Sequence, residues 1–126
     1  MEEAARAGSG PAACRLGDRY RDGSGVEQNW EEAFRWYSLG ARAGDAESQN
    51  NLGCMYGNGH FTPQDEAQAI HWYTLSAAQG HAVAQFNLGQ QYLHGRGVQL
   101  DYVEAMRLFE ASAAQDYALA FADLGM

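Results

Sequence analysis

The sequence predicts an all-α solenoid of about three and a half helix-turn-helix repeats with a 36-residue period. The dipeptide Leu-Gly recurs every 36 residues, and a tyrosine follows each of the first three anchor leucines by four residues. A period between about 20 and 50 residues indicates an array in which each unit buries its apolar face on the next. A spacing of four residues is helical rather than alternating. The anchor leucines are Leu16, Leu52, Leu88 and Leu124, and the tyrosines are Tyr20, Tyr56 and Tyr92.

Each repeat is predicted to continue into a second helix that begins with a capping box. In this motif the first side chain accepts a hydrogen bond from the first turn, and a Glu or Gln three residues later reaches back to the N-cap amide. Gly44 and Gly80 are expected to end the first two of these helices in the left-handed conformation, whereas Asp116 stands at this position in the third repeat. The capping pairs are Asn29 with Glu32, Asp65 with Gln68 and Asp101 with Glu104.

Large side chains recur at one position of every second helix and are predicted to form the core. Their repetition in all three repeats favours packing over a ligand-binding role. The pairs are Trp36 and Tyr37, Trp72 and Tyr73, and Leu108 and Phe109.

The whole chain, residues 1–126, is expected to form one domain. Its repeats are predicted to span 9–44, 45–80 and 81–116, with the tail of a preceding second helix at 1–8 and the first helix of an incomplete repeat at 117–126. Natural arrays close their ends with polar caps. We therefore expect either that the chain is a piece of a longer array or that its ends associate. The residues expected in such self-association are Leu119, Phe121 and Leu124.

Composition excludes several classes of function. The 126 residues carry a net charge of −8, and all eight basic residues are arginine. The lack of lysine excludes a P-loop, a Schiff-base enzyme and a Ser-x-x-Lys acyl-transfer site. Because the sequence has no basic run, neither nucleic acid nor an anionic membrane surface is expected as a partner.

No catalytic, cofactor-binding or metal-binding site is predicted. The four histidines show no i, i+3 or i, i+4 pairing, so their spacing does not indicate a metal ligand set. Cys14 and Cys54 are too few for a disulfide framework and are expected to be reduced thiols. The sequence has no recognisable signal peptide or transmembrane segment, so we expect a cytoplasmic or otherwise soluble chain. The histidines are His60, His71, His81 and His94.

The run from Leu88 to Asp101, with its Gly95-Arg-Gly97-Val98 loop, resembles a Sel1-like repeat, a relative of the tetratricopeptide repeat. The resemblance implies a right-handed α-solenoid that serves as a scaffold for protein–protein contacts, with the first helices lining the concave surface. One loop departs from the family pattern, because Phe61 stands where the matching loops have glycine. We expect Phe61 either to fill a local gap or to form a second contact point on the rim.

Helical geometry selects the candidate groove residues on the first helices. At 100° per residue, they lie on the face opposite the packing stripe of the anchor leucine. Amide side chains there are predicted to bridge the backbone of an extended peptide, and Phe86 to supply an aromatic anchor. The alternative is that these are ordinary solvated side chains. The predicted groove residues are Asp18, Asn50, Asn51, Cys54, Asn58, Phe86, Asn87, Gln90, Leu93 and His94.

These observations predict a non-enzymatic scaffold or adaptor that binds a peptide or protein segment in its concave groove. The second hypothesis is a self-assembling structural module that associates through its uncapped solenoid ends. The first hypothesis places the contact on the first helices, and the second places it at the ends of the array.

Overall fold

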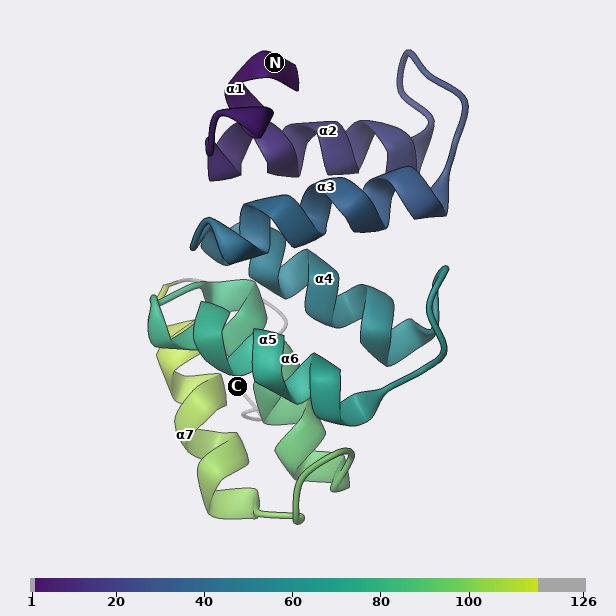
Figure 1. The fold of residues 1–126 in the computed structure, drawn as a ribbon. Helices are drawn as coiled ribbons and strands as arrows, with labels where there is room; N and C mark the ends of the chain where they lie inside the picture. The colour runs from purple at the N-terminus through teal and green to yellow at the C-terminus, as the bar shows by residue number, and fades with distance from the viewer. Residues whose placement is uncertain (1, 116–126) are drawn as a thin grey trace.

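The structure is a computed structural model that describes residues 2–115, and Figure 1 shows its helices stacked one after another from the N-terminus to α7. Within each repeat the helices pack as the pairs α2/α3, α4/α5 and α6/α7, and successive repeats meet through α3 with α4 and α5 with α6. The predicted all-α array of helix pairs is confirmed. None of the described helices is long and apolar enough to cross a membrane. The helices are α1 (Glu2–Arg6), α2 (Gly10–Asp22), α3 (Trp30–Arg42), α4 (Ala46–Asn58), α5 (Glu66–Ala78), α6 (Ala82–His94) and α7 (Tyr102–Ala113).

The second helices α3, α5 and α7 begin at the predicted caps, but only half of the capping box forms. The side chains of Asn29, Asp65 and Asp101 each accept a hydrogen bond from the backbone amide three residues later. The predicted reciprocal bond, from the N-cap amide to the Glu or Gln side chain, was wrong. The N-cap amide donates instead to the backbone carbonyl of the tyrosine that follows the anchor leucine by four residues. The three carbonyls belong to Tyr20, Tyr56 and Tyr92, at 2.8, 2.9 and 3.0 Å. The start of each second helix is therefore tied to the first helix of its own repeat.

Glycine ends both kinds of helix. Gly23, Gly59 and Gly95 follow α2, α4 and α6 in the left-handed conformation, which glycine adopts without a Cβ clash. As predicted, Gly44 and Gly80 also have positive φ, at 90° and 85°. The prediction for Asp116 lies outside the described residues.

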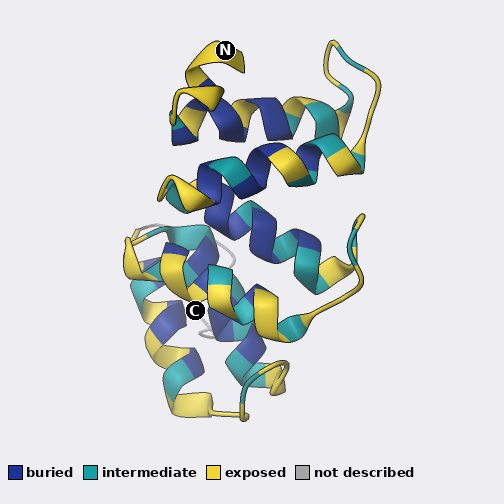
Figure 2. Cartoon of the chain, in the orientation of Figure 1, coloured by how far each residue is buried: buried dark blue, intermediate teal, exposed yellow. Residues whose placement is uncertain are grey.

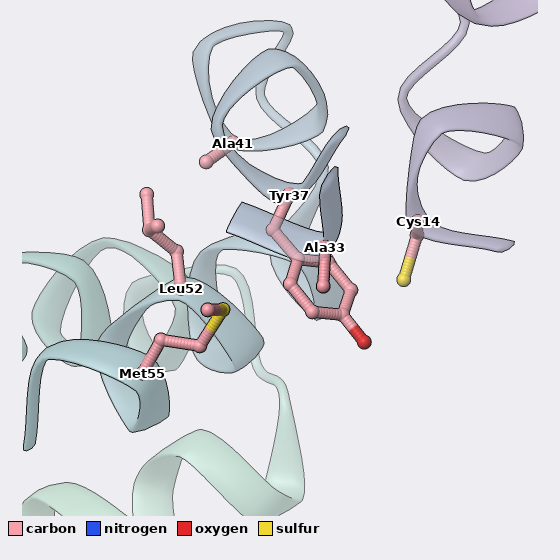
Figure 3. Packing of buried hydrophobic residues seen from close by; sticks show 6 residues of the cluster. All are labelled: Cys14, Ala33, Tyr37, Ala41, Leu52 and Met55. Atoms are coloured by element: carbon pink, nitrogen blue, oxygen red, sulfur yellow. The ribbon is translucent and has the colours of Figure 1, made fainter. Parts of the chain in front are cut away.

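Buried residues alternate with more exposed ones along the helices, as the dark blue, teal and yellow segments of Figure 2 show. One cluster joins repeats 1 and 2 across α2, α3 and α4. As predicted, Trp36, Tyr37 and Phe109 belong to the core, with only 2%, 0% and 1% of their surface exposed. The members of the cluster, drawn in Figure 3, are Cys14, Ala33, Tyr37, Ala41, Leu52 and Met55.

The glycine that follows each anchor leucine, here called the anchor glycine, contacts an aromatic ring of the second helix. This contact explains why the glycine and the ring recur with the same period. A Cβ atom added to Gly17 would lie 2.5 Å from the Tyr37 ring. In the second repeat the same atom on Gly53 would lie 2.8 Å from the Tyr73 ring. These distances are far below van der Waals contact, so only glycine lets the ring of the second helix approach the first helix. The third repeat repeats the contact with Gly89 and Phe109.

Candidate functional site

The predicted groove residues lie on α2, α4 and α6, and polar contacts join these three helices. The Nδ2 of Asn51 on α4 lies 3.7 Å from the Sγ of Cys14 on α2. The Nδ2 of Asn87 on α6 donates to the Oδ1 of Asn50 at 3.0 Å and lies 3.7 Å from the Sγ of Cys54, both on α4. These contacts link α2 to α4 and α4 to α6, and we call the five residues that make them the amide ladder: Cys14, Asn50, Asn51, Cys54 and Asn87.

The predicted groove residues on α4 differ in exposure. Asn50 was expected to face the groove, but it is only 4% exposed and is occupied by Asn87, so that expectation was wrong. Asn51, Cys54 and Asn87 are half-buried, whereas Asn58 is exposed. Asn58 is therefore the predicted residue on α4 that is most open to a partner.

Asp18 is held by two groups at the start of the surface. The Tyr37 hydroxyl donates to the Oδ1 of Asp18 at 2.5 Å, and the Arg21 guanidinium lies 3.5 Å from the same oxygen. Burial and the Asp18 carboxylate raise the pKa of Tyr37, so the hydroxyl stays protonated as a donor. In the second repeat the Tyr73 hydroxyl makes the equivalent contact to the Sγ of Cys54, at 3.4 Å.

Both cysteines are free thiols in environments that oppose ionisation. Burial, with the nearby carboxylates of Asp18 and Glu47, raises the pKa of Cys14 to about 12. Burial also raises the pKa of Cys54. Because the thiolate is the nucleophile, neither cysteine has the environment of a reactive thiol.

A cavity of about 150 Å³ opens beside the ladder where repeat 1 meets repeat 2. One wall is formed by Trp30 at the start of α3 and His60 after α4, whose rings stack in parallel at 4.0 Å between centroids. The rest of the lining combines a cation, amides and apolar surface. The lining residues are Arg21, Trp30, Tyr37, Asn51, Cys54, Met55, Asn58 and His60.

Sequence reasoning found part of this cavity. It selected Asn51, Cys54 and Asn58, which the structure brings together, and it missed Trp30 and His60. Both missed residues break the repeat pattern: Glu66 and Tyr102 stand at the Trp30 position, and Ser24 and Arg96 at the His60 position. This break in the repeat pattern was the sequence signal that could have identified Trp30 and His60.

The remaining predicted residues lie away from the cavity. Phe86 is half-buried, and its ring packs against Phe109 at 5.6 Å between centroids. The Nε2 of His94 lies 3.1 Å from the Oε1 of Gln90, and Leu93 is half-buried next to it in sequence. The predicted self-association residues Leu119, Phe121 and Leu124 lie outside the described residues.

A family model for the Sel1 repeat matches residues 10–45, 46–81 and 82–117. The chain belongs to the Sel1 repeat family. Sel1 repeat proteins are generally non-enzymatic scaffolds that mediate protein–protein interactions. The repeat limits predicted from the sequence start one residue earlier than the matched ranges and remain a prediction.

Solved structures of Sel1 repeat proteins share the fold. A Sel1 repeat protein from Oxalobacter formigenes is 38% identical with a TM-score of 0.89, over 98% of this chain and 93% of its own. The protective antigen c5321 of uropathogenic Escherichia coli is 37% identical with a TM-score of 0.93, and the match covers 98% of this chain but 27% of that one. Cysteine-rich protein B of Helicobacter pylori has the same fold at 22% identity and a TM-score of 0.75, over 96% and 92% of the two chains. No curated protein matches the sequence significantly.

Proposed function

We propose that this Sel1 repeat chain is a non-enzymatic adaptor that binds a segment of another protein along the first helices, with the cavity between repeats 1 and 2 as its principal subsite. The observation that carries this proposal is the position of the cavity. It opens on the same face as the amide ladder and shares Asn51 and Cys54 with it. A side chain of the partner would enter the cavity while the partner backbone follows the ladder.

The lining supports a mixed polar and aromatic ligand side chain. Asn58 and Asn51 offer amide donors and acceptors, and the stacked Trp30 and His60 rings offer an apolar wall. A cavity of about 150 Å³ has room for one side chain and not for a large cofactor. The chemistry present therefore favours recognition over catalysis, because burial raises the pKa of the Cys54 thiol in the lining and so keeps it from acting as a nucleophile.

The test fills the cavity without disturbing the ladder. Asn58→Trp places a bulky side chain at an exposed position of α4, and Thr74→Trp makes the same change at an exposed position of α5 as the matched control. The wild-type chain and both variants serve as affinity baits, the captured protein is purified, and its affinity is measured by calorimetry. We expect Asn58→Trp to weaken binding about tenfold or more, as loss of a central contact does. Equal affinity of all three chains, with helicity retained, would reject the cavity as the subsite.

Self-association is a second candidate function, favoured by the exposed apolar face of α7. Val103 is 82% exposed and Met106 is 39% exposed. The residue matching Met106 in repeat 1, Phe34, is instead covered by the Tyr56 ring of the following repeat. We propose that a second copy covers this face of α7. Val103→Glu introduces a glutamate, the residue type that repeat 1 has at this position in Glu31. In analytical ultracentrifugation we expect the wild type to form an oligomer and Val103→Glu to be a monomer. A wild type that is monomeric at all concentrations would contradict the proposal.

A further inference from the structure

We propose that the loop between α4 and α5 carries a second binding surface, on which an arginine or lysine side chain of a partner protein stacks against Phe61 and pairs with Glu31. We call this surface the Phe61 patch: Phe61, Phe34 and Glu31. It is separate from the cavity lining and from the amide ladder.

Phe61 occupies a strained backbone position. Its φ is 64°, and it is the one residue other than glycine with positive φ in the described part of the chain. Gly25 and Gly97 stand at the same position of the other two loops, with φ of 75° and 72°. The Thr62 amide donates to the His60 carbonyl at 2.7 Å, which closes a three-residue turn around Phe61. Turns of this kind with positive φ at the centre are rare and unfavourable for a residue with a side chain.

Burial does not offset this strain. Phe61 keeps 55% of its surface exposed. The expectation that Phe61 fills a local gap is therefore wrong for most of its surface. Its ring contacts Phe34 at 5.3 Å between centroids, and Phe34 meets the Tyr56 ring edge-on at 5.5 Å. In Figure 1 this loop rises at the right toward the start of α3. The patch is thus an aromatic surface anchored to two helices and open to solvent.

Charges of both signs lie near the patch: Glu31 supplies a carboxylate, whereas Arg35 and Arg42 line a hollow beside Phe34. Glu31 is exposed and stands three residues before Phe34, on the same side of α3. The nearest cation along α3, Arg35, is occupied by Glu32 at 3.5 Å and lies over the Trp36 ring at 5.3 Å. No ion pair to Glu31 forms among the residues that the structure describes, and an aromatic face near such a carboxylate attracts a guanidinium or ammonium group. The chain's net charge of −8 acts in the same direction at long range.

A pair of defined peptides tests this proposal. The cationic probe is a fluorescein-labelled decapeptide of alternating glycine and arginine, and the neutral probe has glutamine in place of arginine. Binding to the full chain is measured by fluorescence anisotropy for wild type, Phe61→Gly and Glu31→Gln. Glu3→Gln, at an exposed position of α1, removes the same charge elsewhere and serves as the matched control.

We expect Phe61→Gly to weaken binding of the arginine peptide about two- to fivefold, the range of an exposed cation–π contact. Its melting temperature should stay the same or rise, because glycine fits the left-handed position. Glu31→Gln should weaken binding more than Glu3→Gln, and the glutamine peptide should not bind.

Equal binding by wild type and Phe61→Gly, or equal binding of the two peptides, would overturn the proposal. A clearly lower melting temperature of Phe61→Gly would also overturn it, since Phe61 would then be a packing residue. None of these outcomes bears on the adaptor function, because that proposal is tested by Asn58→Trp, outside the patch.

Discussion

At the scale of single residues, two glycines of the same helix have different roles. Gly53 of α4 leaves room for the Tyr73 ring, which an added Cβ would approach to 2.8 Å. Gly57, one turn later, has space: its added Cβ would meet its nearest neighbours at 3.6 Å, an ordinary contact distance. The anchor glycine is therefore required by the contact between the two helices of a repeat, and Gly57 is not.

This difference predicts opposite effects of the same substitution. Gly53→Ala should lower the free energy of unfolding by about 1–3 kcal/mol, because the ring of Tyr73 or the helix must shift. Gly57→Ala should raise it by about 0.5–1 kcal/mol, because alanine restricts the unfolded chain and favours the helix. Urea denaturation of the two variants measures both. Destabilisation of similar size in both variants would contradict the glycine–ring contact.

His81 is a residue whose role depends on its protonation. Its Nδ1 accepts a hydrogen bond from the Ala84 amide at 3.2 Å and so caps α6, where Ser9 and Asp45 cap the two earlier first helices. Burial is the main cause of a lowered His81 pKa, against the opposing charges of Glu47 and Asp45. A ring that accepts at Nδ1 must be neutral.

The lowered pKa of His81 predicts a loss of stability at acid pH. The unfolded state binds the proton first, near pH 6.5, so the free energy of unfolding should fall as pH drops below about 6.5 and level off below the folded-state pKa. His81→Asp should remove this part of the pH dependence, because an aspartate cap stays ionised. Thermal melts of both chains between about pH 5 and 8 measure the difference. Parallel curves for the two chains would show that His81 does not act as the cap.

At the scale of the helices, sequence patterns predicted where elements begin and end but not what they contact. Asp65 as a cap and Gly80 as a helix end follow from local backbone chemistry, which the sequence contains. The carbonyl of Tyr56, which receives the Asp65 amide, comes from another helix. Such a partner depends on how two helices pack, so the local motif suggested Gln68 in its place.

The cap of α5 therefore yields an asymmetric prediction. Asp65→Ala should cost about 1 kcal/mol of folding free energy, because the backbone amide of Gln68 loses its acceptor. Gln68→Ala should change stability by only a few tenths of a kcal/mol, because its side chain does not complete a capping box. Chemical denaturation of each variant gives both values. If Gln68→Ala lowered the folding free energy by about 1 kcal/mol, the reciprocal bond of the capping box would be present after all.

At the scale of the whole molecule, the 36-residue period predicted the array, and departures from the period locate the candidate sites. Residues that repeat, such as Tyr37 and Tyr73, pack in the core. Trp30 and His60 do not repeat, and they meet only because repeat 2 stacks on repeat 1. Helical geometry selected a face of the first helices as a candidate groove, and that selection stays a prediction. The cavity could not be predicted in this way, because its walls come from different repeats.

The most direct measurement is an NMR map of the backbone amides and indole N–H groups of the chain, before and after saturation with the protein that it captures. If the first helices form the binding surface, the largest chemical-shift changes will fall at Asn51, Cys54 and Asn58 and at the Trp30 indole beside them. Changes confined to the outer face of the second helices, around Thr74 on α5, with none at the cavity, would contradict the assignment of the function to the first helices.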